Sequence, residues 1–222
     1  MPIYKTKNEN FFKKWTPEMA YILGFFTADG NMLKNKRGAH FIEFQITDAD
    51  LLREIQKTLE SNHKISIIQR DKKHKTVYRL QIGSKAMFCD LIKLGLTPAK
   101  SKTIKLPRVP SKYFCHFVRG YFDGGGNVSF GFFKKADRKN KSRVLLSRFT
   151  SGSEVFIKEL KKALSDSINL TGSLFKKSDN SWYLNYSIRD SGKLFMFMYE
   201  RNPEKLIYLR RKYNIYRQAG VA

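Results

Sequence analysis

The stretch "EMAYILGFFTADGNM", residues 18–32, reads as a helix that ends in a glycine turn, and the chain repeats it as "HFVRGYFDGGGNV", residues 116–128. Thr16, Pro17 and Glu18 supply an N-cap, a first helical residue and an acid near the positive end of the helix dipole. Gly125 stands in the second copy where the first copy has Asp29. The repeat organises the chain, and the missing carboxylate is the difference to explain.

The same pattern of elements follows each copy of the motif. Residues 42–46 and residues 128–132 alternate apolar and small or polar side chains, which is typical of half-buried strands. Amphipathic helical stretches come next, and a second strand pair then runs into another helix. We therefore expect an α+β protein with two pseudo-symmetric αββαββα domains, residues 1–106 and 107–222, each with an antiparallel sheet.

The charge balance favours a nucleic-acid partner. The 222 residues include 43 Lys and Arg but 19 Asp and Glu, which gives a formal net charge of +24. Basic side chains neutralise phosphates and release counterions. No apolar run approaches the ~18 residues of a membrane span, and the two cysteines fit no zinc or disulfide framework. These features predict an intracellular protein with no membrane partner.

The two motifs are specific enough to suggest a family. "ILGFFTADG" (22–30) and "VRGYFDGGG" (118–126) resemble the signature helices of single-chain LAGLIDADG homing endonucleases, and the repeat extends the resemblance over essentially the whole chain. The resemblance implies a monomer with saddle-shaped sheets and with motif helices that touch at Gly24 and Gly120. It also implies an intron- or intein-encoded protein that acts where the host genome lies, in the cytoplasm or nucleoid, a plastid or a mitochondrion.

The same resemblance assigns the catalytic acid to Asp29, and to the position now held by Gly125. Phosphodiester hydrolysis needs a metal ion, and Mg²⁺ prefers a few carboxylates together with water and phosphate oxygens. We expect Mg²⁺ at Asp29, with Mn²⁺ or Ca²⁺ able to substitute, and with help from the carbonyls of Ala28 and Gly124. The alternative for Asp29 is a helix-terminal turn residue. Asp123 precedes position 125 by two residues, which places it about 200° around the helix from that position. We interpret it as a capping or packing residue.

Basic side chains near the phosphate are the next candidates. The resemblance implies a lysine near the start of the last helix of each half, which points to Lys100 and to either Lys212 or Arg211. Such a group would stabilise developing negative charge. Plain phosphate binding is the equal alternative.

The outward faces of the strands carry side chains suited to base edges, and the hairpin tips carry basic residues suited to phosphates. We therefore predict double-stranded DNA as the partner, with a solvated sheet face as the alternative. The predicted contact residues are Lys34, Lys36, Arg37, His40, Glu43, Gln45, Arg70, Lys72, Lys75, Arg79, Gln81, Ser129, Lys134, Lys135, Arg138, Lys141, Arg143, Tyr183, Asn185, Ser187 and Arg189.

The resemblance as a whole implies Mg²⁺-dependent cleavage of a long, non-palindromic duplex across the minor groove, leaving 3′ overhangs. Gly125 predicts that this activity is reduced to nicking or abolished. One alternative is a maturase on the same scaffold that binds intron RNA. Another is a non-cleaving DNA-binding regulator, but such regulators append a helix-turn-helix domain, and we expect no room for one after "NIYRQAGVA".

Overall fold

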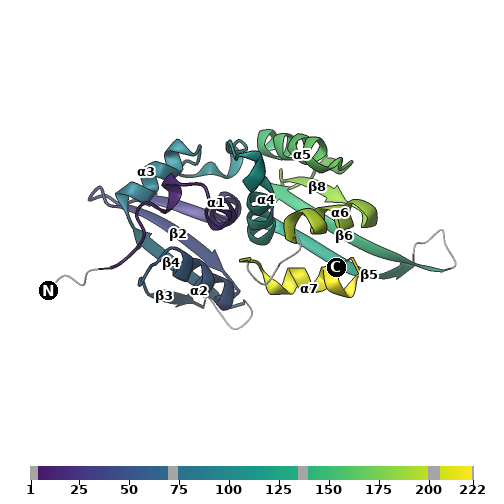
Figure 1. Cartoon of the computed structure of the whole chain (residues 1–222), viewed down its shortest axis with the longest axis horizontal. Helices are drawn as coiled ribbons and strands as arrows, with labels where there is room; N and C mark the ends of the chain where they lie inside the picture. The colour runs from purple at the N-terminus through teal and green to yellow at the C-terminus, as the bar shows by residue number, and fades with distance from the viewer. Residues whose placement is uncertain (1–4, 70–74, 135–139, 200–205, 222) are drawn as a thin grey trace. The chain divides into compact units, whose positions relative to one another are not determined.

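The computed structural model describes residues 5–69, 75–134, 140–199 and 206–221, and it contains two copies of one topology (Figure 1). Contacts divide the chain into two compact units, residues 1–100 with 107–124, and residues 101–106 with 125–222. They therefore group most of the second motif helix with the first half. The division at residue 106 stays a proposal about the sequence repeat.

In the first copy, a motif helix is followed by two hairpins and two further helices. The elements are α1 (Pro17–Asp29), β1 (Gly30–Lys34), β2 (His40–Ile46), α2 (Ala49–Thr58), β3 (Ile65–Ile68), β4 (Val77–Gly83) and α3 (Lys85–Lys93). Short 3₁₀ turns at Phe11–Lys13 and Lys100–Lys102 flank them. The antiparallel strands lie in the order β1-β2-β4-β3.

The second copy repeats this order with longer helices and a longer first hairpin. It comprises α4 (Ser111–Gly125), β5 (Gly126–Lys134), β6 (Lys141–Ser151), α5 (Glu154–Ile168), β7 (Ser173–Lys176), β8 (Trp182–Tyr186), α6 (Ile188–Tyr199) and an additional helix, α7 (Arg210–Gln218). Its strand order, β5-β6-β8-β7, matches the first sheet. The expected αββαββα repeat is confirmed.

The helices begin where local hydrogen bonding dictates. Thr16 accepts a bond from the Met19 amide at 3.1 Å and caps α1, and Asp48 accepts from the Leu51 amide at 3.0 Å and caps α2. Each bond satisfies one of the backbone donors that a helix start leaves unpaired.

Strand alternation separates a helix-covered face from an open face in each sheet. Ile42, Phe44, Leu80 and Ile82 are fully buried under the helices of the first unit, with Phe44 and Phe26 in edge-to-face contact at 5.1 Å. The open faces carry the polar side chains between these positions. Within the described residues, no helix combines the length and apolar character that a bilayer crossing requires.

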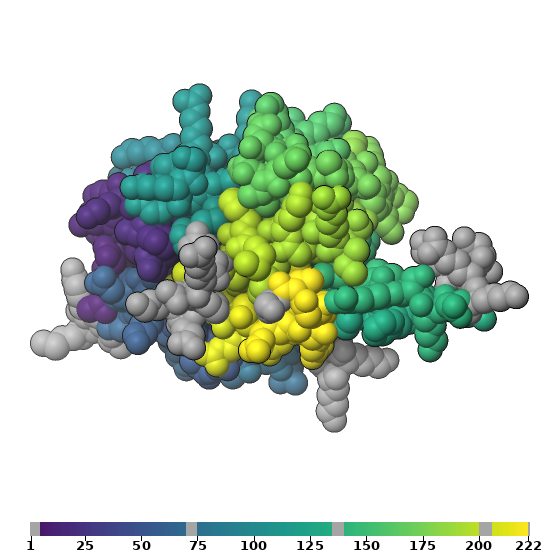
Figure 2. Space-filling view, turned by 45° about the vertical axis from the view of Figure 1, so that its right-hand side comes forward, coloured from purple at the N-terminus to yellow at the C-terminus, as the bar shows by residue number. Residues whose placement is uncertain are grey.

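The expected burial fails at the far end of β5. Phe132 has 62% of its surface exposed, although it alternates with the buried Val128. The end of the β5–β6 ribbon projects beyond α7, which lies against its base in the space-filling view (Figure 2). Alternation therefore gave the correct face for Phe132, but among the described elements no helix covers this end of the ribbon.

The cap of α2 gives a direct stability test. Asp48→Ala removes the acceptor for the Leu51 amide and should lower the free energy of unfolding by about 1 kcal/mol, measured by urea denaturation. Asp50→Ala is the matched control, because this exposed acid only pairs with Arg53 at 2.7 Å and should change stability by less than about 0.5 kcal/mol. Equal effects would contradict the assigned cap.

Candidate catalytic residues and nucleic-acid interface

The two motif helices approach each other backbone to backbone within the first unit, which contains α1 and residues 111–124 of α4. A Cβ added at Gly24 would collide with the carbonyl oxygen of Phe117, and one added at Gly120 would collide with that of Tyr21. Tyr21 and Phe117 hold equivalent positions in the two motifs, so the contact is reciprocal. Glycine is required at both positions because no side chain fits between the helices.

A buried polar cluster accompanies this contact and is not reciprocal. The Tyr21 hydroxyl donates to Oδ2 of Asp123 at 2.9 Å, and Arg119 lies 3.0 Å from Nδ1 of His116 and 5.2 Å from the Tyr21 ring centre. Arg119 and Asp123 are 1% and 2% exposed. Asp123 is therefore interpreted as a helix-packing residue, because its side chain is buried and accepts a hydrogen bond from the facing helix.

Alanine at Gly120 tests the close approach. Gly120→Ala should destabilise the protein by about 3 kcal/mol, because the new methyl group meets rigid backbone rather than a flexible side chain. Gly192→Ala is the matched helical control, because its Cβ would meet only Val221 at 3.8 Å, and it should stabilise by about 1 kcal/mol. Thermal denaturation of both variants measures the difference, and a neutral Gly120→Ala would sink the packing assignment.

Asp29 is the last residue of α1 and is exposed to solvent. A Cβ at Gly124 of α4 would lie 2.9 Å from that of Ala28 and 3.6 Å from that of Asp29, so the ends of the two helices meet beside this carboxylate. Gly125 follows as the last residue of α4 and contributes no carboxylate. The negative ends of helix dipoles favour a cation here.

A buried lysine holds the junction between motif helix and first strand in each half. Lys100 is 8% exposed and donates through Nζ to the carbonyl of Gly30, and Lys212 is 3% exposed and donates to the carbonyl of Gly126 at 2.6 Å. Gly30 and Gly126 are equivalent positions, each directly after the motif acid or its replacement. Arg211, which the sequence left as an alternative to Lys212, is exposed.

The ionisation of Lys100 is perturbed. Burial lowers the pKa of Lys100 from 10.5 to about 8, and the negative charge of Asp29 opposes that shift. A lysine with this pKa carries a substantial neutral fraction just above neutral pH, while a nearby anion such as a phosphate would restore its charge. Lys100 is therefore placed to respond to charge at the Asp29 end of the helix.

This shift predicts a titration. The Nζ signal of Lys100 in an NMR titration of ¹⁵N-lysine-labelled protein should have its midpoint near pH 8, and Asp29→Asn should move the midpoint lower, because it removes the stabilising carboxylate. Because the folded pKa lies below the unfolded value, the unfolded chain binds more protons between pH 8 and 10.5. Stability relative to Lys100→Met should therefore rise with pH across that window. A midpoint near 10.5 would refute the burial.

The groups at the helix ends fit a particular kind of metal ion. Across the part of the chain that the structure describes, no cluster of three or more His, Cys, Asp or Glu side chains could enclose a metal. One exposed carboxylate beside half-buried backbone suits a hard divalent cation that keeps water and shares phosphate oxygens. It does not suit zinc, which prefers a closed tetrahedral set of nitrogen and sulfur ligands.

The open face of the first sheet holds the four strand residues that the sequence predicts there, Glu43, Gln45, Arg79 and Gln81. Glu43 is 4% exposed and accepts from the side-chain amides of Gln45 at 2.6 Å and Gln81 at 3.2 Å, with Nη1 of Arg79 at 3.8 Å. Glu43 is buried beneath these neighbours, so it orients their side chains and has little surface of its own for a ligand.

The second sheet presents Ser129, Tyr183 and Asn185 on its open face, together with Arg148, which sequence reasoning missed. Arg148 donates through Nε to Oδ1 of Asn185 at 2.8 Å, and its guanidinium carbon lies 4.5 Å from the centre of the Tyr183 ring. The missed signal was alternation around Ser147, which is fully buried because its hydroxyl bonds Tyr216 at 2.6 Å. A serine in a core position hides the pattern that would place Arg148 outward.

Four of the predicted contact residues do not lie on the open face of either sheet. His40 faces the helix-covered side and packs edge-to-face on Phe88 at 4.7 Å, and Arg143 donates to the carbonyl of Ala219 at the end of α7. Ser187 and Arg189 are not on a strand, because β8 ends at Tyr186 and α6 begins at Ile188. The strand-face assignment was wrong for these two residues, because the local hydrogen bonds of the α6 start, such as the Ser191 amide to the Ser187 carbonyl at 2.8 Å, end the extended backbone.

The remaining predicted residues are peripheral. Exposed basic side chains occupy strand ends and turns at Lys34, Lys36, Arg37, Lys75, Lys134 and Lys141. Arg70, Lys72, Lys135 and Arg138 lie outside the described residues.

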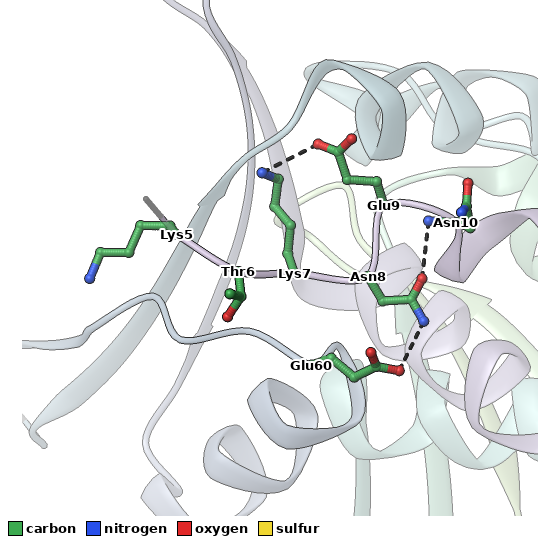
Figure 3. Close-up of a pocket in the computed structure, with 7 residues that line it drawn as sticks. All are labelled: Lys5, Thr6, Lys7, Asn8, Glu9, Asn10 and Glu60. Carbon is green, nitrogen blue, oxygen red and sulfur yellow. Dashed lines mark hydrogen bonds and ion pairs between the residues drawn. The ribbon is translucent and has the colours of Figure 1, made fainter. Parts of the chain in front are cut away.

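A surface hollow of about 480 Å³ lies apart from these groups, lined by residues 5–10 and Glu60 (Figure 3). Its lining bonds to itself, with Lys7 and Glu9 paired at 3.3 Å and the Asn8 amide donating to Glu60 at 3.0 Å. None of the candidate residues lines it.

Comparison with known proteins agrees with this geometry. The sequence model of the LAGLIDADG-like domain matches residues 16–93. The homing endonuclease I-LtrWI, solved bound to target DNA, matches with a TM-score of 0.59 at 14% identity over 96% of this chain and 89% of that one. I-SmaMI, solved on an uncleaved DNA target in the presence of calcium ions, matches with a TM-score of 0.56 at 15% identity over 92% and 89%.

A sequence relative, the uncharacterized protein MJ0398 of Methanocaldococcus jannaschii, is 24% identical over 86% of this chain and 70% of its own length. The first half of this chain thus carries a LAGLIDADG-like domain, and the whole chain has the fold of single-chain LAGLIDADG homing endonucleases. The domain model covers the first motif and the shared fold extends over both copies, so the resemblance drawn from the two motifs is confirmed at the level of the fold.

Proposed function

We propose that this chain binds one long, non-palindromic DNA duplex and hydrolyses one strand of it, with Asp29 as the only motif acid. The observation that carries the proposal is the exposed Asp29 carboxylate where the ends of α1 and α4 meet, beside a helix whose final residue is Gly125. The net charge of +24 and the polar open faces of both sheets support DNA as the substrate.

The Asp29 carboxylate, with the carbonyls of Ala28 and Gly124, would hold Mg²⁺, and Mn²⁺ or Ca²⁺ could take its place. When bound, such an ion polarises the phosphate and lowers the pKa of the attacking water. The chain's own contribution is to fix the carboxylate at a rigid helix end and to leave it open to a phosphate.

Each half would place one buried lysine near its motif acid position, but the two positions differ in what the lysine meets there. Lys100 lies where the charge of Asp29 reaches it, so an approaching phosphate would favour its ammonium form. Lys212 makes the equivalent carbonyl contact in the second half, but Gly125 offers no carboxylate for a metal there. The asymmetry predicts a nick rather than a double-strand break.

A plasmid assay tests this directly. The target duplex, first selected by the protein from a randomised library, is placed in a supercoiled plasmid and incubated with Mg²⁺. Wild-type protein should yield nicked circles, Asp29→Asn should lower the nicking rate by at least about 100-fold, and Gly125→Asp should yield linear plasmid by restoring the second acid.

Asp50→Asn is the matched control, because it removes one exposed carboxylate on α2 and should leave nicking unchanged. Nicking that survives in Asp29→Asn would refute the assigned acid. Gly125→Asp protein that binds its site and still produces no linear plasmid would refute the assigned second centre.

The absent carboxylate also favours a second candidate, in which the scaffold binds intron RNA without hydrolysing DNA. Competition between the selected duplex and a structured intron RNA at equal phosphate concentration separates the two. RNA that displaces the duplex at several ionic strengths would support the maturase instead.

A further inference from the structure

The two sheets carry one equivalent row of open-face residues with opposite chemistry. In the first sheet, strand register aligns Asn31 with Glu43 and Glu43 with Gln81. In the second, it aligns Asn127 with Arg148 and Arg148 with Asn185. We call these alignments the first central row and the second central row. The first is centred on an anion and the second on a cation.

The first central row leaves hydrogen-bond acceptors available. Glu43 is buried near Arg79, and an ionised carboxylate can only accept hydrogen bonds. The amide nitrogens of Gln45 and Gln81 must therefore turn toward Glu43, as their bonds of 2.6 and 3.2 Å require. Their carbonyl oxygens are then the groups directed away from the carboxylate.

The second central row leaves donors available. A guanidinium can only donate, so Asn185 must turn its carbonyl oxygen toward Arg148, as their 2.8 Å bond requires. That bond uses Nε, and the Tyr183 ring supports the guanidinium at 4.5 Å. These two contacts fix the side chain and do not use its two Nη groups. The Nη groups are the part of the guanidinium that fits a guanine edge.

We infer that the two central rows read bases of opposite hydrogen-bonding character, with Arg148 selecting guanine and with Glu43 acting as a positioning residue that makes Gln45 and Gln81 select an amino-bearing base, cytosine or adenine. In the major groove, guanine offers O6 and N7 as acceptors, whereas cytosine N4 and adenine N6 are donors. The inference rests on the proposed function that the open faces read duplex DNA. It names which base each half demands and why the site must be asymmetric.

Selection from a randomised duplex library in Ca²⁺, with the full chain, measures the preference at every position. The wild-type pool should contain a guanine enriched by about 10-fold or more in one half-site, in line with 1–3 kcal/mol for a bidentate contact. Arg148→Lys keeps the positive charge but loses the paired donors of the guanidinium. Guanine enrichment at that one position should therefore fall below about 2-fold. The salt dependence of binding should not change.

Glu43→Gln should relax the amino-base preference in the other half-site and leave the guanine untouched, because a neutral amide lets Gln45 and Gln81 turn either way. Arg53→Lys and Glu154→Gln make the same chemical changes on α2 and α5, where Arg53 pairs with Asp50 and Glu154 with Lys158, and both pools should match wild type.

The possible failures are distinguishable. Guanine enrichment that persists in Arg148→Lys, or a Glu43→Gln pool identical to wild type, overturns this inference while DNA reading stands. A wild-type pool with no enriched base at any position overturns the proposed function itself.

Discussion

The backbone contact between α1 and α4 is the constraint on which the site depends. Gly24 and Gly120 let each helix place a carbonyl where the other would carry a Cβ, and the helix ends then stay together down to Ala28 and Gly124. The contact is reciprocal in backbone but not in side chains, because Tyr21 bonds Asp123 whereas the equivalent Phe117 has no hydroxyl to offer. A single chain can have such an asymmetric helix contact, because its two motif helices need not be identical in sequence.

The same contact would couple the proposed base reading to the proposed hydrolysis. β1 begins at Gly30, directly after Asp29, and β5 begins at Gly126, directly after Gly125. A buried lysine bonds the carbonyl at each of these junctions, Lys100 at Gly30 and Lys212 at Gly126. The first strand of each sheet therefore starts from a fixed point, which would hold the proposed base-contacting side chains at set distances from the motif acid position.

Much of the fold and several site positions could be predicted from the sequence, because the apolar side chains of both copies follow the periods of helices and strands. The motif helices, the strand order within each copy and the open-face positions of Glu43, Gln45, Arg79 and Gln81 follow from alternation and from the glycine-rich motif ends. The choice between Lys212 and Arg211 did not follow, because burial decides it and both residues suit a basic helix start.

Other positions escaped sequence reasoning for definite physical reasons. Arg148 was hidden by Ser147, a core serine whose hydroxyl is satisfied by Tyr216, so the strand lacks a clean apolar alternation there. Ser187 and Arg189 continued the alternation of β8 in sequence, but a helix start replaced the strand. Arg143, predicted as a DNA contact, also donates to the carbonyl of Ala219 at the end of α7, a contact between distant segments that strand alternation does not indicate.

A crystal structure of the chain on its selected duplex, grown with Mn²⁺, tests the central claim most directly. The Mn²⁺ anomalous signal should place an ion in contact with the Asp29 carboxylate and one DNA phosphate, at the roughly 2.0–2.3 Å typical of oxygen ligands to small divalent ions. An ion elsewhere, or Asp29 remote from every phosphate, would contradict the claim that this helix end is the centre of hydrolysis.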